Sequence, residues 1–324
     1  MLLYIEEKVI NHPRTKSIQN IFPKAEIVPI NNYKSIFQQK INWPTSQTRI
    51  IAQLEGNAVV EAPTWYGHSD HGFFFKTTLN CIFDCQYCYL KWAFKNHFPV
   101  HFVNYQDIQD QIATKIDKRQ KDNPKKTMRW YASDRSDTQW FDAFLWWNKT
   151  FFPFFDNFTN IMVESRTKAY DISSLLTIES PTNFEIAYSL NPQILINKYE
   201  KWTAPLATRI TNINKLLNHW YKVWIRCMPV LPVPNYQEIY EQFLQYLTTN
   251  IDVQKIYSFF VGWLMYTDED YKKIKQKEPW LDILYRLEKS PDWFRRESKS
   301  IRNSIYNLFK KYIPNCQICM DNCS

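Results

Sequence analysis

The sequence predicts an α/β fold in which a largely parallel sheet of six strands curls into a partial (β/α)6 barrel of the TIM type. Two observations predict it. Apolar runs of strand length alternate with longer segments of helical spacing, which is typical of a parallel sheet wrapped by helices. Six such units are too few to close an ordinary eight-stranded barrel, so we expect an open one with its chemistry at the carboxyl ends of the strands.

The expected elements follow the chain in order. Strands are expected at 72–79, 128–131, 160–164, 183–189, 222–229 and 255–262. Helical spacing predicts helices near 104–121, 139–152, 171–177, 205–220 and 236–250, and two more at 268–278 and 292–312. We therefore divide the chain into an N-terminal cap (1–70), the barrel (71–265) and a C-terminal helical extension (266–324) that ends in a cysteine-rich tail.

Composition limits the class of protein. The chain has 324 residues, of which 17% are aromatic and four are glycine, which is typical of a packed globular protein. No stretch has the roughly 18 apolar residues that span a bilayer, and the N-terminus turns acidic too early for a secretory signal. We expect a soluble, cytoplasmic protein without a membrane partner. The net charge of +8 is compatible with nucleic acid, an acidic peptide or a phosphorylated small molecule, and selects none of them.

The cysteines carry the clearest signal. Six of the seven fall in two clusters, while Cys227 stands alone in an apolar strand and is expected to be structural. Cys81, Cys85 and Cys88 form a Cys-x3-Cys-x2-Cys pattern directly after the first predicted barrel strand. Thiolates so close in sequence can hold one iron–sulfur cube from a single loop, and three ligands leave one iron open to a small chelating molecule. The alternative is a zinc site completed by a fourth ligand such as His97 or His101.

The second cluster lies at the end of the sequence. Cys316, Cys319 and Cys323 fall within eight residues. One interpretation is a second metal site, holding either an additional iron–sulfur cluster or zinc. The other is an exposed tail whose cysteines are incidental or form a structural clip.

The first cysteine loop resembles the defining motif of the radical S-adenosylmethionine (SAM) superfamily, including the aromatic Tyr87 before the third cysteine. The resemblance implies a [4Fe–4S] cluster on Cys81, Cys85 and Cys88, with SAM chelated to its open iron. One-electron reduction would then cleave SAM to methionine and a 5′-deoxyadenosyl radical. The fold implied is the partial barrel of the radical SAM kind.

Within that superfamily the chain resembles the spore photoproduct lyase family over nearly its whole length. The resemblance is carried by Leu3-Tyr4-Ile5-Glu6, Cys85-x-Tyr87-Cys88-Tyr89-Leu90, Ala132-Ser133-Asp134, Thr167-Lys168, Tyr188-Ser189-Leu190-Asn191, and the spacing from Glu200 through Pro205 to Arg209. It implies that one set of residues contacts the cofactors and that Tyr89 lines the radical path. The cofactor-contacting set is Tyr87, Ser133, Lys168, Ser189 and Asn191.

Two departures point away from repair of DNA photoproducts. The lyase carries a cysteine that returns a hydrogen atom to the substrate radical, and Tyr131 stands at that position here. A tyrosine can still pass a hydrogen atom or an electron, so we assign Tyr131 as a candidate radical relay. The lyase also has a basic hairpin that inserts at the DNA lesion. The corresponding stretch, 282–293, is short and has only Arg286 and Lys289 as basic residues.

These observations lead to a predicted function with two alternatives. We expect a radical SAM lyase that acts on a ribosomally made precursor peptide, as the related spliceases do when they excise a tyramine unit. Its partners would be the peptide, a small leader-recognition protein, and an electron donor such as flavodoxin or ferredoxin. The alternatives are a lyase for DNA or RNA lesions, and a non-enzymatic iron–sulfur or zinc protein that binds nucleic acid. The third fails to explain why the cysteines follow the first strand of a β/α series.

Overall fold

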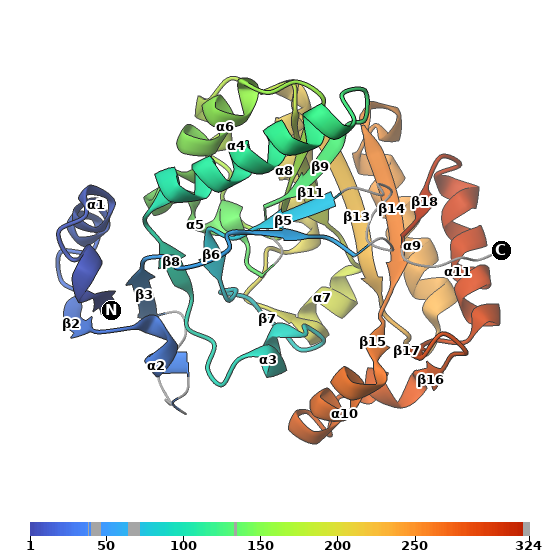
Figure 1. Cartoon of the computed structure of the whole chain (residues 1–324). Helices are drawn as coiled ribbons and strands as arrows, with labels where there is room; N and C mark the ends of the chain where they lie inside the picture. The colour runs from blue at the N-terminus through green and yellow to red at the C-terminus, as the bar shows by residue number, and fades with distance from the viewer. Residues whose placement is uncertain (38, 40–46, 64–71, 133–134, 320–324) are drawn as a thin grey trace.

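The main sheet confirms the predicted α/β fold. The computed structural model describes residues 1–37, 39, 47–63, 72–132 and 135–319. Six strands run parallel and in chain order through the centre of the main sheet (Figure 1). They are β5 (Gly72–Phe75), β9 (Met128–Tyr131), β10 (Ile161–Thr167), β11 (Phe184–Ser189), β13 (Lys222–Val230) and β14 (Ser258–Trp263).

The sheet stays open, as the number of units predicts. A short strand lies at each edge: β4 (Val59–Glu61) pairs antiparallel with β5, and β18 (Gln317–Ile318) pairs parallel with β14. Because the strand order runs from β18 to β4 without joining them, the barrel is partial.

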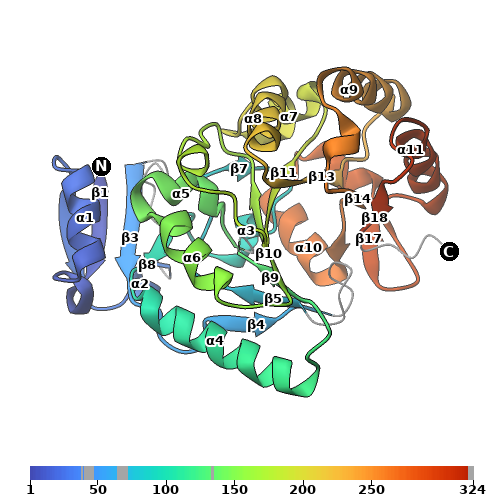
Figure 2. The same cartoon turned by 90° about the horizontal axis from the view of Figure 1, so that it is seen from above.

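Helices cover one face of this sheet, on the outside of the barrel (Figure 2). They are α4 (Tyr105–Asp122), α5 (Thr138–Leu145), α6 (Trp147–Asp156), α7 (Gln193–Tyr199), α8 (Leu206–Asn218) and α9 (Tyr236–Asn250). The outward side chains of each strand belong to the main hydrophobic core, for example Val223, Ile225 and Cys227 of β13. Successive side chains of a strand point to opposite faces. Trp224, Arg226 and Met228 therefore face the opposite side, which we call the lumen.

Three sequence-based expectations are wrong in detail. The predicted strand 72–79 splits, because β6 (Thr78–Leu79) leaves the main sheet and pairs with β8 (Val100–Phe102). The predicted helix 139–152 is two helices, because Trp146 adopts a left-handed conformation (φ 50°) between α5 and α6. The predicted helix 171–177 is only the 3-10 turn η3 (Leu175–Thr177).

The N-terminal region, predicted as a cap over 1–70, contains most of a second sheet. Its strands are ordered β2 (Glu26–Ile30), β1 (Leu2–Glu6), β3 (Thr48–Ala52), β8 and β6, so that this sheet continues past residue 70. The short helices η1 (Glu7–Val9), α1 (Pro13–Ile21) and α2 (Tyr33–Phe37) accompany it. The fully buried Glu6 ties it together by accepting hydrogen bonds from the backbone N–H groups of Tyr33 (2.8 Å) and Gln53 (3.0 Å).

The C-terminal region is less helical than expected. The elements η4 (Val253–Lys255) and α10 (Asp268–Lys277) are followed by the turn η5 (Asp282–Arg286). The strands β15 (Tyr266–Thr267), β17 (Phe294–Arg296) and β16 (Glu288–Lys289) form a small antiparallel sheet. The helix predicted at 292–312 begins only at α11 (Lys299–Tyr312), because 294–296 is held as a strand. No helix in the described ranges is long and apolar enough to cross a membrane.

Candidate functional site

The three clustered cysteines lie on a loop that local structure fixes at both ends. The loop leaves β6 at Asn80, which adopts a left-handed conformation (φ 64°) and donates its side-chain N–H to the carbonyl of Phe98 (2.9 Å). Further on, β7 (Asp84–Cys85) pairs antiparallel with β12 (Glu200–Lys201), so that Cys85 lies opposite Glu200. A turn closed by the Cys88 N–H on the Cys85 carbonyl (3.0 Å) leads into α3 (Leu90–Ala93).

All three cysteines line two cavities that lie on either side of the loop. One cavity, of about 240 Å³, also includes His97 and Trp202. The other, of about 170 Å³, includes Ser189, Ser136 and Asp137 from the loop after β9, and residues from the carboxyl end of β10. The cysteine loop is thus placed at the carboxyl ends of the barrel strands, where the sequence predicts the site.

The donor set fits a [4Fe–4S] cluster better than a single metal ion. Over the described residues, no group of three or more Cys, His, Asp or Glu side chains could hold one metal ion. A cube binds each thiolate to a different iron, so its ligands lie farther apart than those of one zinc ion. Of the two histidines proposed for zinc, His97 lines the first cavity, whereas His101 is buried with its ring 4.4 Å from that of Phe141.

Burial keeps the thiols protonated in the metal-free chain. It raises the pKa of Cys85 to about 12, although the nearby Lys168 ammonium opposes the rise. Burial likewise raises the pKa of Cys81 and Cys88. Because only thiolates bind metal, cluster binding would release these protons.

A buried carboxylate, Glu200, organises the residues on the cofactor side of the loop. Its Oε1 accepts hydrogen bonds from Tyr87 and from Asn191 Nδ2 (2.8 Å), and its Oε2 accepts from Arg209 (2.7 Å). Burial alone would raise the pKa of the Glu200 carboxyl. Lys168 and Arg209 outweigh burial and hold this pKa below its ordinary value.

Lys168 connects this carboxylate to the cysteine loop. Its Nζ lies 3.1 Å from Glu200 Oε1, 2.7 Å from the Tyr87 hydroxyl and 3.6 Å from Cys85 Sγ. Burial lowers the pKa of the ammonium, but Cys85 and Glu200 together raise it above its usual value. A fixed positive charge therefore lies beside a cluster ligand, where it favours the thiolate.

The predicted cofactor-binding residues fall into three groups. Tyr87, Lys168 and Asn191 surround Glu200, and Ser189 lines the second cavity. Ser133 lies outside the described residues. Tyr89, predicted to line the radical path, lines the same cavity as Ser189 and is 40% exposed.

Two buried polar atoms at this site make no hydrogen bond within the described part of the chain. Ser136 Oγ, on the wall of the second cavity, and Asn191 Oδ1 have no hydrogen-bond partner among the described residues. Buried polar groups are normally satisfied, so these atoms suit a polar ligand such as SAM. The fit of the residues to both cofactors thus rests on the thiol triad, Lys168 and these two atoms.

The sequence reasoning missed three residues that shape the site. The sequence analysis named Glu200 and Arg209 only for their spacing in the family resemblance, and it did not name Asp137. Asp137 accepts hydrogen bonds from the backbone N–H groups of Trp140 (3.0 Å) and Lys168 (2.8 Å), and so joins the start of α5 to the end of β10. Burial raises the pKa of Asp137 to about 6. Asp137 could have been identified as a helix-capping residue, because an aspartate directly precedes the aromatic segment that forms α5.

The lumen contains two buried carboxyl groups that face three arginines. Glu164 of β10 accepts hydrogen bonds from Arg166 (3.0 Å) and from Arg226 of β13. Glu185 of β11 pairs with Arg129 of β9 at 2.8 Å.

The proposed radical relay, Tyr131, lies on this lumen side of the sheet. It is 2% exposed, it is the register partner of Glu164, and its ring lies 5.4 Å from that of Phe74. The structure thus places the tyrosine inside the barrel, while its role stays a prediction.

Of the C-terminal cysteines, the structure describes Cys316 and Cys319, and it places these two in different clusters. Cys316 belongs to the main core, whereas Cys319 packs in a separate cluster on the lumen side. They flank the extended strand β18, and residues three apart on a strand point to opposite faces. Cys323 lies outside the described residues.

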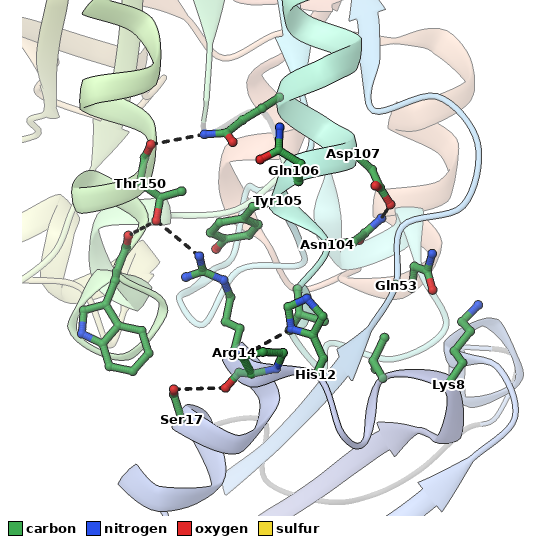
Figure 3. A pocket seen from close by; sticks show the side chains of 15 residues that line it. Lys8, His12, Arg14, Ser17, Gln53, Asn104, Tyr105, Gln106, Asp107 and Thr150 are labelled. Atoms are coloured by element: carbon green, nitrogen blue, oxygen red, sulfur yellow. Dashed lines mark hydrogen bonds between the residues drawn. The ribbon is translucent and has the colours of Figure 1, made fainter.

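A larger cavity lies away from the cysteines. About 710 Å³ in volume, it lies between the N-terminal sheet region and helices α4 and α6 (Figure 3). Arg14 crosses it, with its guanidinium 4.0 Å from the Tyr105 ring centroid and hydrogen-bonded to the Leu145 carbonyl (2.6 Å). None of its described lining residues is a cysteine, and Arg14 and Thr150 join its two sides by a hydrogen bond (3.4 Å), so we regard it as a seam between two parts of the fold.

Comparison with known proteins gives concordant matches. A family model described as spore photoproduct lyase matches residues 69–290. The spore photoproduct lyase of Clostridium acetobutylicum is 28% identical over 166 residues, covering 51% of this chain and 48% of the relative. The match thus spans about half the length of that curated relative.

Two solved structures are similar over nearly the whole chain. One is a spore photoproduct lyase complexed with dinucleoside spore photoproduct, and the other is a double mutant with bound AdoMet and dinucleoside spore photoproduct. Each has a TM-score of 0.80 and 16% identity, and covers 98% of this chain and 97% of its own. At that identity the likeness establishes the fold.

Proposed function

The chain belongs to the spore photoproduct lyase family, and from that premise we propose that it is a radical SAM lyase whose substrate is a ribosomally made precursor peptide. When bound, a [4Fe–4S] cluster and SAM supply a 5′-deoxyadenosyl radical that abstracts hydrogen from the substrate and so triggers C–C or C–N cleavage. The observation that carries the proposal is the thiol triad at the carboxyl ends of the parallel strands, beside a buried lysine.

The chain's own residues hold and orient these groups. Cys81, Cys85 and Cys88 are the cluster ligands, and Lys168 favours their ionised form because its ammonium lies 3.6 Å from Cys85 Sγ. Glu200 fixes Lys168 and Asn191 in place, and Asn191 Oδ1 stays available to a polar group of SAM. Burial of this network excludes water from the reacting atoms.

The charges near the late hairpin support a peptide substrate over DNA. The strands β16 and β17 pair antiparallel over two positions, with Glu288 opposite Arg296 and Lys289 opposite Arg295. Arg295 is bound to Asp268 (2.6 Å), and Arg296 to Asp292. Arginines already neutralised by carboxylates contribute little to phosphate binding.

A DNA lesion lyase is the second candidate, supported by the match to the spore photoproduct lyase family and by one observation on the structure. Trp293, in the turn between β16 and β17, is 71% exposed, with the Lys289 ammonium 4.7 Å from its ring. An exposed aromatic ring beside a cation is suited to stack on a base.

For the peptide function, we expect a small leader-recognition protein and a flavodoxin- or ferredoxin-like electron donor as partners.

The first test addresses the chemistry. The protein is purified without oxygen and reconstituted with iron and sulfide, and iron per chain is measured in wild type and in a Cys81/Cys85/Cys88→Ala variant. Both are then incubated with SAM and dithionite. We expect about four irons and 5′-deoxyadenosine from wild type only. Absence of both from wild type, with zinc bound in their place, would reject the proposal.

The second test addresses the substrate. Binding to duplex DNA is measured against salt concentration, since the affinity of a phosphate-binding protein falls steeply with salt, by a log–log slope of about −0.9 per phosphate. We expect a flat response. In parallel, a short peptide encoded next to the gene is incubated with the active enzyme, and loss of the mass of a tyramine unit is sought. A steep salt slope with an unchanged peptide would favour the lesion lyase.

A further inference from the structure

The strand β18 brings a cysteine to the lumen wall. It pairs parallel with β14, with Gln317 beside Phe260 and Ile318 beside Val261, and the Cys319 N–H donates to the Val261 carbonyl (2.8 Å). Continuing this register places Cys319 beside Gly262, on the face that Phe260 occupies. Cys319 is accordingly 1% exposed and packs with Ala187, Trp224 and Phe260.

Cys319 lies at the same end of the sheet as the candidate site, which is the end where the parallel strands have their carboxyl termini. Ser189, Arg226, Phe260 and Gln317 form one row across four neighbouring strands. Ser189 lines the cavity that the cluster cysteines share. Cys319 lies two residues beyond this row, toward the carboxyl ends of the strands, so its thiol is on the site's side of the lumen.

The residues around this thiol also point to a ligand. Trp224, which packs with Cys319, and Arg226 each have a buried N–H group, on Nε1 and on Nε, with no hydrogen-bond partner among the described residues. Both residues face the lumen, and the Arg226 guanidinium lies 3.9 Å from the Trp224 ring centroid. Unsatisfied buried donors on one wall indicate that the wall binds a polar molecule, because native interiors rarely leave such groups unpaired.

From these observations we propose that Cys319 is a hydrogen-atom donor to carbon radicals formed in the lumen. The inference rests on the proposed function, which supplies the radical. An S–H bond is much weaker than an aliphatic C–H bond or the O–H bond of serine, so a thiol gives its hydrogen atom to an alkyl radical readily. The wall would thus hold the substrate between SAM and this thiol.

The step balances in atoms and electrons. The S–H bond of Cys319 breaks and a C–H bond forms on the radical carbon, leaving a thiyl radical on Cys319. One electron from the low-potential donor of the flavodoxin or ferredoxin class, and one proton from water, restore the thiol. In the test below, dithionite supplies the electron.

Two other residues allow the test to be controlled: Cys316 is a buried thiol outside the lumen, and Tyr131 is a competing hydrogen-atom donor inside it. Cys316 is as buried as Cys319 and close in sequence, but it lies in the main core on the other side of the strand. Tyr131 also faces the lumen and carries an exchangeable hydrogen on a phenol, which is another donor to carbon radicals.

The experiment uses SAM and dithionite without other substrate, in deuterated water. Thiol and phenol hydrogens exchange with solvent, whereas carbon-bound hydrogens do not. We measure by mass spectrometry the fraction of 5′-deoxyadenosine that carries deuterium, a ratio that does not depend on the amount of active enzyme. The variants are Cys319→Ala, Cys319→Ser, Cys316→Ala and Tyr131→Phe, each checked for iron content and thermal unfolding.

We expect label in wild type and in Cys316→Ala, and loss of label in both Cys319 variants. Cys319→Ser is the sharper of the two, because serine is close in size and its hydroxyl also exchanges but does not donate a hydrogen atom. Unlabelled product from wild type, or label that survives in Cys319→Ser, overturns the inference. Label lost only in Tyr131→Phe also overturns it and assigns the donor to the tyrosine. Absence of 5′-deoxyadenosine from wild type instead refutes the proposed function.

Discussion

Replacing Glu200 with glutamine tests the carboxylate around which the cofactor-side residues are arranged. The side chain is fully buried and lies between two cations, Lys168 at 3.1 Å and Arg209 at 2.7 Å. Glutamine keeps its size and most of its hydrogen bonds but removes the negative charge. Leaving a buried cation without its partner costs about 3–5 kcal/mol. We expect the free energy of unfolding of the metal-free chain to fall by that amount.

A double-mutant cycle separates this charge effect from the loss of packing. Lys168→Met leaves Glu200 paired with Arg209, so its cost should be about 1.5–3 kcal/mol, the value of hydrogen bonds to charged groups. In the variant Glu200→Gln/Lys168→Met, one cation and the anion leave together. The combined loss should therefore be smaller than the sum of the single losses, by about 0.5–3 kcal/mol.

The assay is urea unfolding followed by circular dichroism, with the free energy extrapolated linearly to water. Asp282→Asn is the matched control. It removes a carboxylate that lies 2.7 Å from Lys198, in a pair whose side chains are more than half exposed. Such surface pairs contribute at most about 1 kcal/mol. If Glu200→Gln costs no more than this control, or if the cycle shows no coupling, the electrostatic reasoning is refuted.

Two further predictions concern the lumen. Burial raises the pKa of Glu185 to about 7 despite Arg129, so the folded chain favours the protonated carboxyl. As the pH rises from about 4.3 to about 7, wild type should lose roughly 3 kcal/mol of unfolding free energy relative to Glu185→Gln, and a pH-independent difference in urea titrations would contradict this. A Cβ at Gly262 would lie 2.8 Å from Met228 Cε and 2.9 Å from Met228 Cγ, so the methionine cannot relieve the clash by moving its flexible end alone. Gly262→Ala should therefore destabilise the chain by about 1–3 kcal/mol. The cost should shrink in a Met228→Ala background, and thermal melts showing equal costs would argue against this clash.

The sequence was sufficient to predict the barrel and the position of the cysteine loop. The six central strands are buried on both faces, so each reads as an apolar run, and the helices between them keep a clear spacing. Boundaries failed where tertiary pairing decided the conformation. The segment 294–296 was expected to lie in a helix from its spacing, but β17 is held between β15 and β16. The predicted strand 72–79 splits because its second half pairs with β8.

The centre of the site was harder to predict. Glu200 was named from the sequence only for its spacing to Pro205 and Arg209 in the family resemblance, and that spacing does not reveal its role at the centre of the site. Its role arises because β12 pairs with β7 and so places it opposite Cys85, far away in sequence. For the C-terminal cysteines the sequence left a second metal site and a structural or incidental tail both open. Extended backbone between Cys316 and Cys319 directs these two side chains to different faces, which their close spacing alone does not reveal.

The openness of the barrel also has a consequence for the two edges of its sheet. An open sheet has two edges whose free N–H and C=O groups can pair with another chain, and long edge strands promote aggregation. Here the outermost strands are short: β18 has two residues and β4 has three. Glu61, at the end of β4, is bound by Lys115 at 2.9 Å, which adds charge at that edge. The lumen can thus stay open while the edges of the sheet offer neighbouring molecules only short strands with which to pair.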